Sequence, residues 1–205
     1  MLAELLAHPG VEERCELRSP FGFMAFHGGN LERGTDMIAA AAAEQAGASL
    51  YAVLQPSDLR WHIPSTEFSP AASPALARFV EHVSVVVALH GYGREGYWTT
   101  LLLGGGNREL ASALGTNLRT RLPGFTIEDD VDAIPVALRG LHPSNPVNLP
   151  ARRGVQLELP PRVRGQAPTS QAWHIEAVVE ALTATATTFS RQLGARRAPS
   201  SLENR

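Results

Sequence analysis

Two histidines stand in the same local setting, each at the end of a short apolar run and directly before a glycine. His27 follows the run Phe21–Phe26, and His90 follows the run Val83–Leu89. Runs of this length, rich in aromatic and β-branched residues, are typical of buried β-strands. Because imidazole nitrogens bind zinc, both positions are candidate metal ligands at strand ends.

Two carboxylates accompany these histidines. Glu32 follows His27 by five residues, and Glu158 stands near the end of a third apolar run, Val155–Leu159. Two histidines, one carboxylate and a water form a common catalytic zinc shell, and a further glutamate often serves as the general base. A five-residue step excludes the helical H-E-x-x-H motif, so His27 and Glu32 must meet through a loop.

The spacing alone leaves the metal site open, because a histidine at a strand end is more often simply hydrogen-bonded. Strand periodicity is more informative for Glu158. In the stretch QLELP, alternation places Gln156 and Glu158 on one face and Leu157 and Leu159 on the other. The two leucines then belong to the hydrophobic core, and Glu158 faces a cleft. The alternative is that Glu158 forms a structural ion pair with an arginine.

The elements that must position these residues alternate between strands and helices. This order predicts a single α/β domain with a mixed, mainly parallel sheet and helices on both faces, whose ligand site lies at the carboxyl ends of the strands. We expect a zinc hydrolase-like domain over residues 1–193 and a flexible tail over 194–205. Thr35 and Asp36 are expected to cap the helix that follows the first histidine. The predicted strands are 12–17 (an edge strand), 21–26, 49–54, 83–89, 99–103, 125–127 and 155–159, and the predicted helices are 1–7, 37–45, 74–82, 108–121 and 171–193.

Composition narrows the function classes. The 205 residues carry a formal net charge of −2, which gives no electrostatic reason to expect nucleic acid or a membrane surface as a partner. The single cysteine, Cys15, excludes a multi-cysteine zinc site. No apolar run approaches membrane-spanning length, and the N-terminus lacks the pattern of a signal peptide, so we expect a cytoplasmic protein. The oligomeric state stays open.

Three loops add polar candidates, each with a plainer explanation. The long loop 55–69 contains His62 and is either functional or an ordinary surface loop. A glycine run precedes Asn107 and Arg108, but the spacing matches no nucleotide-binding motif. Asn145 lies in the loop 142–150, where turn formation is the commoner role of asparagine.

Several short motifs, in order, resemble the poly-gamma-glutamate hydrolase family, including its phage-encoded members. The resemblance runs from about Phe21 to Arg162 and rests on FHGGNLERGT, WHIPST, LHGYG, GGGNREL, NPVN and RGVQLELPPRVR. It implies a compact relative of the zinc carboxypeptidases with one Zn²⁺ at the strand ends. Carried over residue by residue, the zinc ligands are His27, Glu32 and His90, and Glu158 falls on the base position. The family positions near the pocket are Arg162, Asn107, Asn145 and His62.

Two departures from the family pattern concern the substrate more than the metal. Glu67 replaces an expected histidine, and the segment Arg94–Trp98 differs from the more polar family loop. The resemblance therefore implies a zinc-dependent hydrolase that cuts gamma-glutamyl or related acidic amide bonds. Arginines suit an acidic peptide or polymer because guanidinium binds carboxylate bidentately. Arg162 is the first candidate, also for the catalytic role of stabilising the oxyanion together with zinc, and Arg108, Arg60 and Arg153 follow. The alternative is a binding protein on the same scaffold that has lost turnover.

Overall fold

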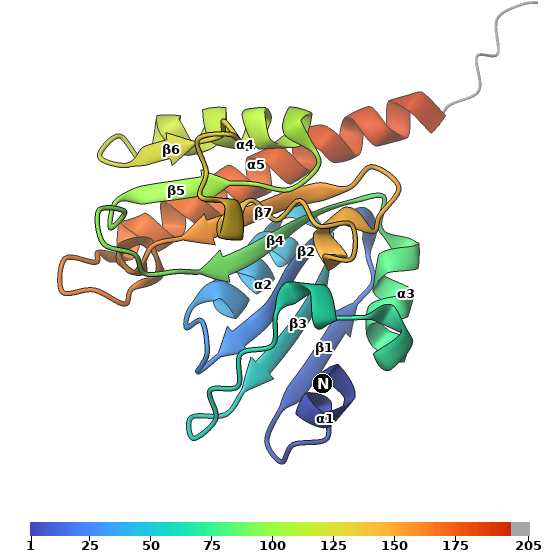
Figure 1. The fold of residues 1–205 in the computed structure, drawn as a ribbon. Helices are drawn as coiled ribbons and strands as arrows, with labels where there is room; N and C mark the ends of the chain where they lie inside the picture. Colours follow the sequence, from blue (N-terminus) through green and yellow to red (C-terminus); the bar gives the residue numbers. More distant parts are fainter. Residues whose placement is uncertain (198–205) are drawn as a thin grey trace, which may run out of the picture.

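The computed structural model describes residues 1–197 and places seven strands in one sheet (Figure 1). Most strands agree with the sequence prediction, including the edge strand that begins at Glu12. The strands are β1 (Glu12–Glu16), β2 (Ser19–Gly29), β3 (Ala48–Gln55), β4 (Val85–Gly91), β5 (Thr100–Leu103), β6 (Thr126–Glu128) and β7 (Gly154–Leu159). The α-helices are α1 (Leu2–Leu6), α2 (Thr35–Ala46), α3 (Pro74–His82), α4 (Arg108–Arg121) and α5 (Ala172–Arg197).

The strand order is β1-β3-β2-β4-β7-β5-β6. Strands β3, β2, β4 and β7 run parallel, β1 pairs antiparallel with β3, and β5 pairs antiparallel with β7. The prediction of a mixed, mainly parallel sheet is therefore confirmed. Strand β7 comes last along the chain but lies between β4 and β5, so its carboxyl end stands beside that of β4 (Figure 1).

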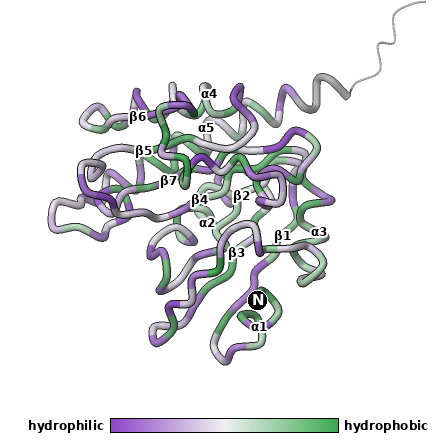
Figure 2. Tube along the Cα trace, viewed as in Figure 1, coloured by the Kyte–Doolittle hydropathy of each residue, from purple (hydrophilic) through white to green (hydrophobic). Residues whose placement is uncertain are grey.

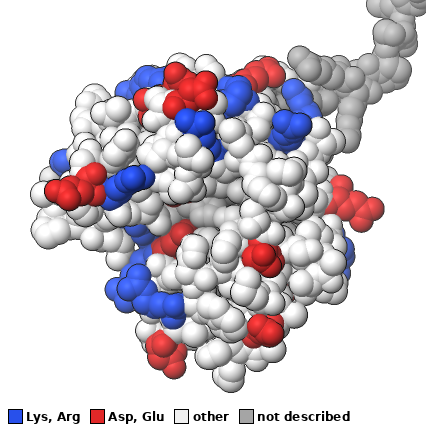
Figure 3. All heavy atoms as spheres, viewed as in Figure 1, with Lys and Arg blue, Asp and Glu red and all other residues white. Residues whose placement is uncertain are grey.

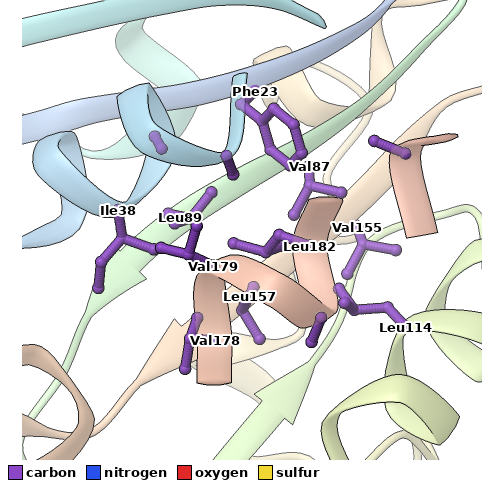
Figure 4. Close-up of a cluster of buried hydrophobic side chains, with 14 of the residues drawn as sticks. Phe23, Ile38, Val87, Leu89, Leu114, Val155, Leu157, Val178, Val179 and Leu182 are labelled. Carbon is purple, nitrogen blue, oxygen red and sulfur yellow. The ribbon is translucent and has the colours of Figure 1, made fainter. Parts of the chain in front are cut away.

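Helices α2, α4 and α5 cover one face of the sheet. Alternate residues of the central strands, such as Phe23, Val87 and Leu157, pack there against Ile38 of α2 and Leu182 of α5 (Figure 4). Strands β4 and β7 are buried along almost their whole length, and Figure 2 shows apolar colouring along much of the central sheet. This face of the sheet is filled by the hydrophobic core, so a functional site must lie elsewhere in the molecule.

The opposite face carries the smaller helices α1 and α3. There the other set of strand residues, including Phe26 and Tyr51, packs with Phe68 and Phe79. On this face the carboxyl ends of β2, β4 and β7 are crossed by loops instead of a long helix (Figure 1). A cavity lies at these strand ends, as expected for open α/β sheets.

The expectation about the start of α2 was wrong. Its N-cap is Gly34, with φ of 90°, and neither Thr35 nor Asp36 caps the helix. Thr35 instead donates its hydroxyl to the Glu32 carbonyl at 2.8 Å, and Asp36 accepts the Gly29 N–H at 3.1 Å. Both side chains point back toward the segment that precedes the helix. Their hydroxyl and carboxylate groups hydrogen-bond to its backbone instead of to the first turn of α2.

The last helix also differs from the prediction. Helix α5 continues to Arg197, four residues into the segment that was expected to be a tail. The remainder of that segment, 198–205, lies outside the described residues. In the described part of the chain, none of the helices has the length and apolar character needed to cross a membrane.

Candidate active site

His27 lies near the end of β2, where the strand is irregular. The register of β2 against β3 shifts between Ala25 and Gly28, which is the mark of a β-bulge. A bulge re-aims the side chains that follow it. Here it turns the His27 ring against Phe68, with 5.4 Å between ring centroids, on the sheet face opposite α2 and α5.

Glu32 reaches His27 through a tight loop between β2 and α2. The Glu32 N–H donates to the His27 carbonyl at 2.9 Å, so the two residues are bound together by backbone as well as side chain. Glu32 Oε1 lies 3.0 Å from His27 Nδ1, and Oε2 accepts the Gly91 N–H at 2.9 Å. The loop between His27 and Glu32 thus brings the two residues into contact, as the sequence predicted.

His90 and Glu158 come from neighbouring parallel strands in exact register. They pair residue for residue across β4 and β7, on the sheet face opposite α2, α4 and α5. His90 Nδ1 lies 3.5 Å from Glu32 Oε2. Both side chains are buried, and His90 Nε2 has no hydrogen-bond partner among the described residues. Strand alternation therefore delivers both groups to the cavity side.

The distances from Glu32 to each of the two buried histidines match the separation of ligand atoms in a metal shell. With bonds of about 2.0–2.2 Å, two ligand atoms of a tetrahedral zinc site stand about 3.3 Å apart. The separations from Glu32 oxygens to His27 Nδ1 and His90 Nδ1 are 3.0 and 3.5 Å. His27 Nε2 donates to the Ile63 carbonyl at 2.8 Å, which leaves a lone pair on Nδ1 of the neutral ring facing a carboxylate. Two acceptors face each other favourably only around a cation or a proton.

His62 is a further member of this cluster. Ligand atoms of His27, Glu32 and His62 all lie within 4.8 Å of one another, so these three residues form a possible metal-binding set. His62 is exposed at the mouth of the cavity, whereas His90 is buried beneath it. Four metal-competent side chains thus line one cavity, and His90 is not a member of the set formed by His27, Glu32 and His62.

The charges of the cluster stabilise one another. Burial opposes ionisation of Glu32, but the neighbouring His90 and His27 outweigh it and hold the pKa of Glu32 well below its usual range. Burial likewise opposes protonation of His90, yet the negative charge of Glu32 raises the pKa of His90 above its ordinary value. A carboxylate that is ionised under all ordinary conditions is suited to hold a cation.

Glu158 has the opposite character. Burial raises the pKa of Glu158 to about 7, reinforced by the charge of Glu32 and opposed by His90. The Gln156 amide donates to Glu158 Oε1 at 2.9 Å, and the Gln156 oxygen accepts from Asn145 at 2.8 Å. This chain fixes the carboxyl group. A carboxyl that exchanges its proton near neutral pH is matched to general acid–base work.

A cavity of about 560 Å³ contains all of these groups. It opens at the carboxyl ends of β2, β4 and β7, visible as the central hollow in Figure 3. Its lining residues are His27, Leu31, Glu32, His62, Pro64, Ser65, Thr66, His90, Gly91, Tyr92, Val136, Ala137, Leu138, Gly140, Leu141, His142, Asn145, Gln156 and Glu158.

Comparison with known protein families shows which kind of protein has this site. The family model described as poly-gamma-glutamate hydrolase matches residues 3–180, most of the chain. The chain belongs to the poly-gamma-glutamate hydrolase family. It is therefore a hydrolase, and its cavity is the candidate active site. A search of curated proteins found no match.

Solved structures share the fold of this poly-gamma-glutamate hydrolase family member. A bacteriophage poly-gamma-glutamate hydrolase matches with a TM-score of 0.76 and 22% identity, covering 92% of this chain and 95% of that one. A protein described as YNDL in its zinc-free apo form matches with a TM-score of 0.69 and 22% identity, covering 85% and 88%. A carboxypeptidase from Burkholderia mallei, described as putative, matches at 0.53 and 11%, covering 94% and 66%. The expected carboxypeptidase-like fold is confirmed.

Not every candidate residue of this family member lies at the cavity. Asn107 caps α4, accepting the Leu110 N–H at 2.9 Å and donating to the Arg152 carbonyl at 2.9 Å. Arg108 donates to the carbonyls of Gly105 and Asp129. Neither side chain lines the cavity.

Arg162 also lies apart from the cavity, although it was the first arginine considered. Its guanidinium stacks on Phe125, with Cζ 5.3 Å from the ring centroid, and its Nε has no partner among the described residues. It lines a separate pocket beside Trp98. The sequence places Arg162 near Glu158, but the turn after β7 directs it away.

Arg164, which the sequence analysis overlooked, is the arginine packed behind the site. It is buried and donates to the carbonyls of Leu159 at 3.0 Å and Arg33 at 2.7 Å. A Cβ on Gly91 would stand 2.6 Å from its guanidinium carbon, so any larger residue there would force the Arg164 side chain to move. The available sequence clue was that Arg164 is the last residue of the motif RGVQLELPPRVR.

Gln156 is a second residue that the sequence analysis did not treat as functional. It was placed on the Glu158 face by strand alternation, but its hydrogen bond to the carboxyl group depends on Asn145, which comes from a distant loop. Asn145 itself lines the cavity and donates to the Gln156 side-chain oxygen.

Proposed function

We propose that this protein is a zinc-dependent hydrolase that cuts gamma-glutamyl or related acidic amide bonds. The observation that carries the proposal is the convergence of His27, Glu32 and His90 beneath a cavity in which Glu158 stands in register with His90. Family membership supports the reaction class, since the family is described as hydrolysing poly-gamma-glutamate.

The donor set suits zinc. His27, Glu32 and His90 would hold the ion, since two imidazoles and a carboxylate are a usual catalytic zinc shell that leaves a position open. When bound there, zinc lowers the pKa of a coordinated water toward about 7 and polarises a carbonyl oxygen. His62, at the mouth, is assigned to the substrate.

Glu158 supplies the proton transfers. Gln156 occupies Oε1, and Oε2 accepts no hydrogen bond from the described residues, so Oε2 takes the proton from the attacking water. The same oxygen then delivers that proton to the leaving amine. A pKa of about 7 permits both steps near neutral pH. Asn145, through Gln156, holds the carboxyl group in place for each transfer.

The test combines metal content with turnover. Purified protein should contain about one zinc per chain and release glutamate from gamma-glutamyl amides, and chelation should abolish the release. Protein that binds zinc but cleaves none of a panel of gamma-glutamyl amides would instead support the binding-protein alternative.

A further inference from the structure

A second hollow lies at the same end of the sheet as the active-site cavity. It has a volume of about 380 Å³ and is formed by residues 98–99, just before β5, and by the segment 161–169, which follows β7. None of its lining residues belongs to the cavity. We call it the Arg162 pocket, and the residues that matter below are Trp98, Thr99, Arg162 and Thr169.

Arg162 brings a positive charge to this pocket. Its guanidinium is stacked on Phe125, with Cζ 5.3 Å from the ring centroid, and its buried Nε has no hydrogen-bond partner among the described residues. No aspartate or glutamate of residues 1–197 lines the pocket. Arg164, two residues later, instead donates to the carbonyls of Leu159 and Arg33. Because a guanidinium has five N–H donors that match a carboxylate, the pocket favours an anion of that shape.

The other lining groups suit a carboxylate on a short apolar chain. Trp98 is 54% exposed, and its flat ring offers apolar surface together with an indole N–H donor. Thr99 and Thr169 add hydroxyl groups to the lining. A gamma-linked glutamate residue carries one free carboxylate and two methylene groups in its main chain, so it matches both the charge and the apolar surface of the pocket.

The pocket and the active-site cavity share one boundary, the segment 91–99. Gly91 and Tyr92 line the cavity, and Trp98 lines the pocket. Gly93 lies between them, where an added Cβ would stand 3.9 Å from both Pro161 and Trp98. Figure 1 shows the segment between β4 and β5 beside the segment that follows β7. A ligand that crosses this boundary would therefore occupy both hollows.

The distance between the two hollows suits a chain of few residues. Glu158 lines the cavity and Arg162 lines the pocket, four residues later, so their Cα atoms are at most about 14 Å apart. The main chain of one gamma-linked glutamate, two bonds longer than that of an ordinary residue, spans about 6 Å. A substrate held at Glu158 would thus place a carboxylate near Arg162 two or three residues along its chain.

We propose that the Arg162 pocket binds a carboxylate of the gamma-glutamyl chain beyond the residues held in the cavity, so that the protein prefers long acidic chains to short ones. This inference rests on the proposed function and narrows its substrate class to oligomers and polymers. Arg162 then acts in substrate binding, away from the reacting bond.

The experiment compares a short and a long substrate, gamma-glutamyl-glutamate and a gamma-linked glutamate decamer. The decisive quantity is how a substitution changes the ratio of their kcat/KM values with zinc-loaded protein, since the decamer also has more bonds to cut. Arg162→Met should lower the decamer-to-dimer ratio by about tenfold or more, the usual effect of losing a hydrogen bond to a charged group. Trp98→Ala, at an exposed position, should lower the ratio in the same direction.

The matched control is Arg78→Met. Arg78 is an exposed arginine on α3, which lies on the opposite face of the sheet from α2 and α5, and it lines neither hollow. This substitution removes the same charge and should leave the ratio unchanged. Calorimetry on Glu158→Gln protein gives a measurement that needs no turnover: adding Arg162→Met should weaken decamer binding about tenfold and dimer binding less.

The outcomes separate this inference from the proposed function. A decamer-to-dimer ratio that Arg162→Met leaves unchanged overturns the pocket and leaves the hydrolase proposal standing. An equal fall in Arg78→Met also overturns it, because net charge alone would then attract the chain. Protein that cuts neither substrate, yet binds the decamer more weakly after Arg162→Met, supports the pocket and overturns the hydrolase proposal.

Discussion

His90 on β4 and Glu158 on β7 are direct register partners, one buried imidazole beside one buried carboxyl group. Their strands are parallel neighbours although the residues are far apart in the chain. The sheet therefore fixes the distance between the proposed metal ligand and the proposed proton-transfer group through the backbone pairing of β4 and β7. Because the proposed metal ligand and the proposed proton-transfer group lie on different strands, a substitution of each residue tests its role separately.

Glu158→Gln should keep zinc and the fold but lose turnover. The amide has nearly the same shape as the carboxyl group, and Gln156 remains available as a hydrogen-bond partner. Loss of a positioned general base usually costs about 10²- to 10⁴-fold, which steady-state kinetics on a gamma-glutamyl amide would measure. Near-normal turnover with zinc bound would remove Glu158 from this role.

Metal affinity should distinguish His90 from His62. If His90 is a ligand and His62 contacts substrate, His90→Ala should weaken zinc binding by more than about a hundredfold, beyond the usual effect of outer-shell residues. His62→Ala should retain zinc and raise KM. Competition with a chromogenic chelator measures both affinities. The reverse order would make His62 the ligand, together with His27 and Glu32.

The stability of the metal-free protein should fall as pH rises from about 5 to 8. Burial raises the pKa of Glu158 to about 7, so the folded state keeps a proton that the unfolded chain releases at lower pH. This stabilising contribution is complete below about pH 4.5 and is lost as pH rises through about 7. Glu32, whose pKa is lowered, acts oppositely and loses its contribution only in acid.

Glu158→Gln isolates that effect. The melting temperature of the metal-free variant should exceed that of the unaltered protein at pH 8 and approach it at pH 5, since glutamine does not titrate. Thermal unfolding in chelator at several pH values checks this. A difference between the two proteins that is constant across the range would mean that Glu158 does not hold its proton in the folded state.

Arg164 and Arg162 should differ sharply in their effect on stability. Arg164→Met leaves buried backbone carbonyls of Leu159 and Arg33 without donors and should cost about 2–5 kcal/mol in free energy of unfolding. Arg162→Met removes only a stacking contact with Phe125, worth about 0.5–1 kcal/mol. Urea unfolding compares them. Equal losses would contradict the structural role given to Arg164.

The fold was largely predictable because its signals are local. The boundaries of α3 and α4 match the predicted 74–82 and 108–121, where Ser73 and Asn107 cap helices with ordinary chemistry. Strand alternation placed Glu158 correctly for the same reason. The start of α2 could not be predicted, since Thr35 and Asp36 turn toward a loop whose position depends on β3.

The site was predictable only in part. Strand ends and motif resemblance identified His27, Glu32, His90 and Glu158, which the structure brings to one cavity. The direction taken by Arg162 and the exposure of Val136 depend on how the turn after β7 and the 136–142 segment pack. This packing depends on contacts between residues that are far apart in the chain. Residue types and their spacing do not predict such contacts.

The position of β7 has a consequence for how the chain folds. When synthesis has reached the end of β6, the inner edges of β4 and β5 have no strand between them, and unpaired edges of this kind invite aggregation. Docking of β7 closes both edges at once and delivers Glu158 in the same event. Placing β7 between β4 and β5 closes a long loop of the chain, and closing a long loop is entropically costly and slow. We therefore expect the slowest folding step to coincide with the gain of catalytic competence.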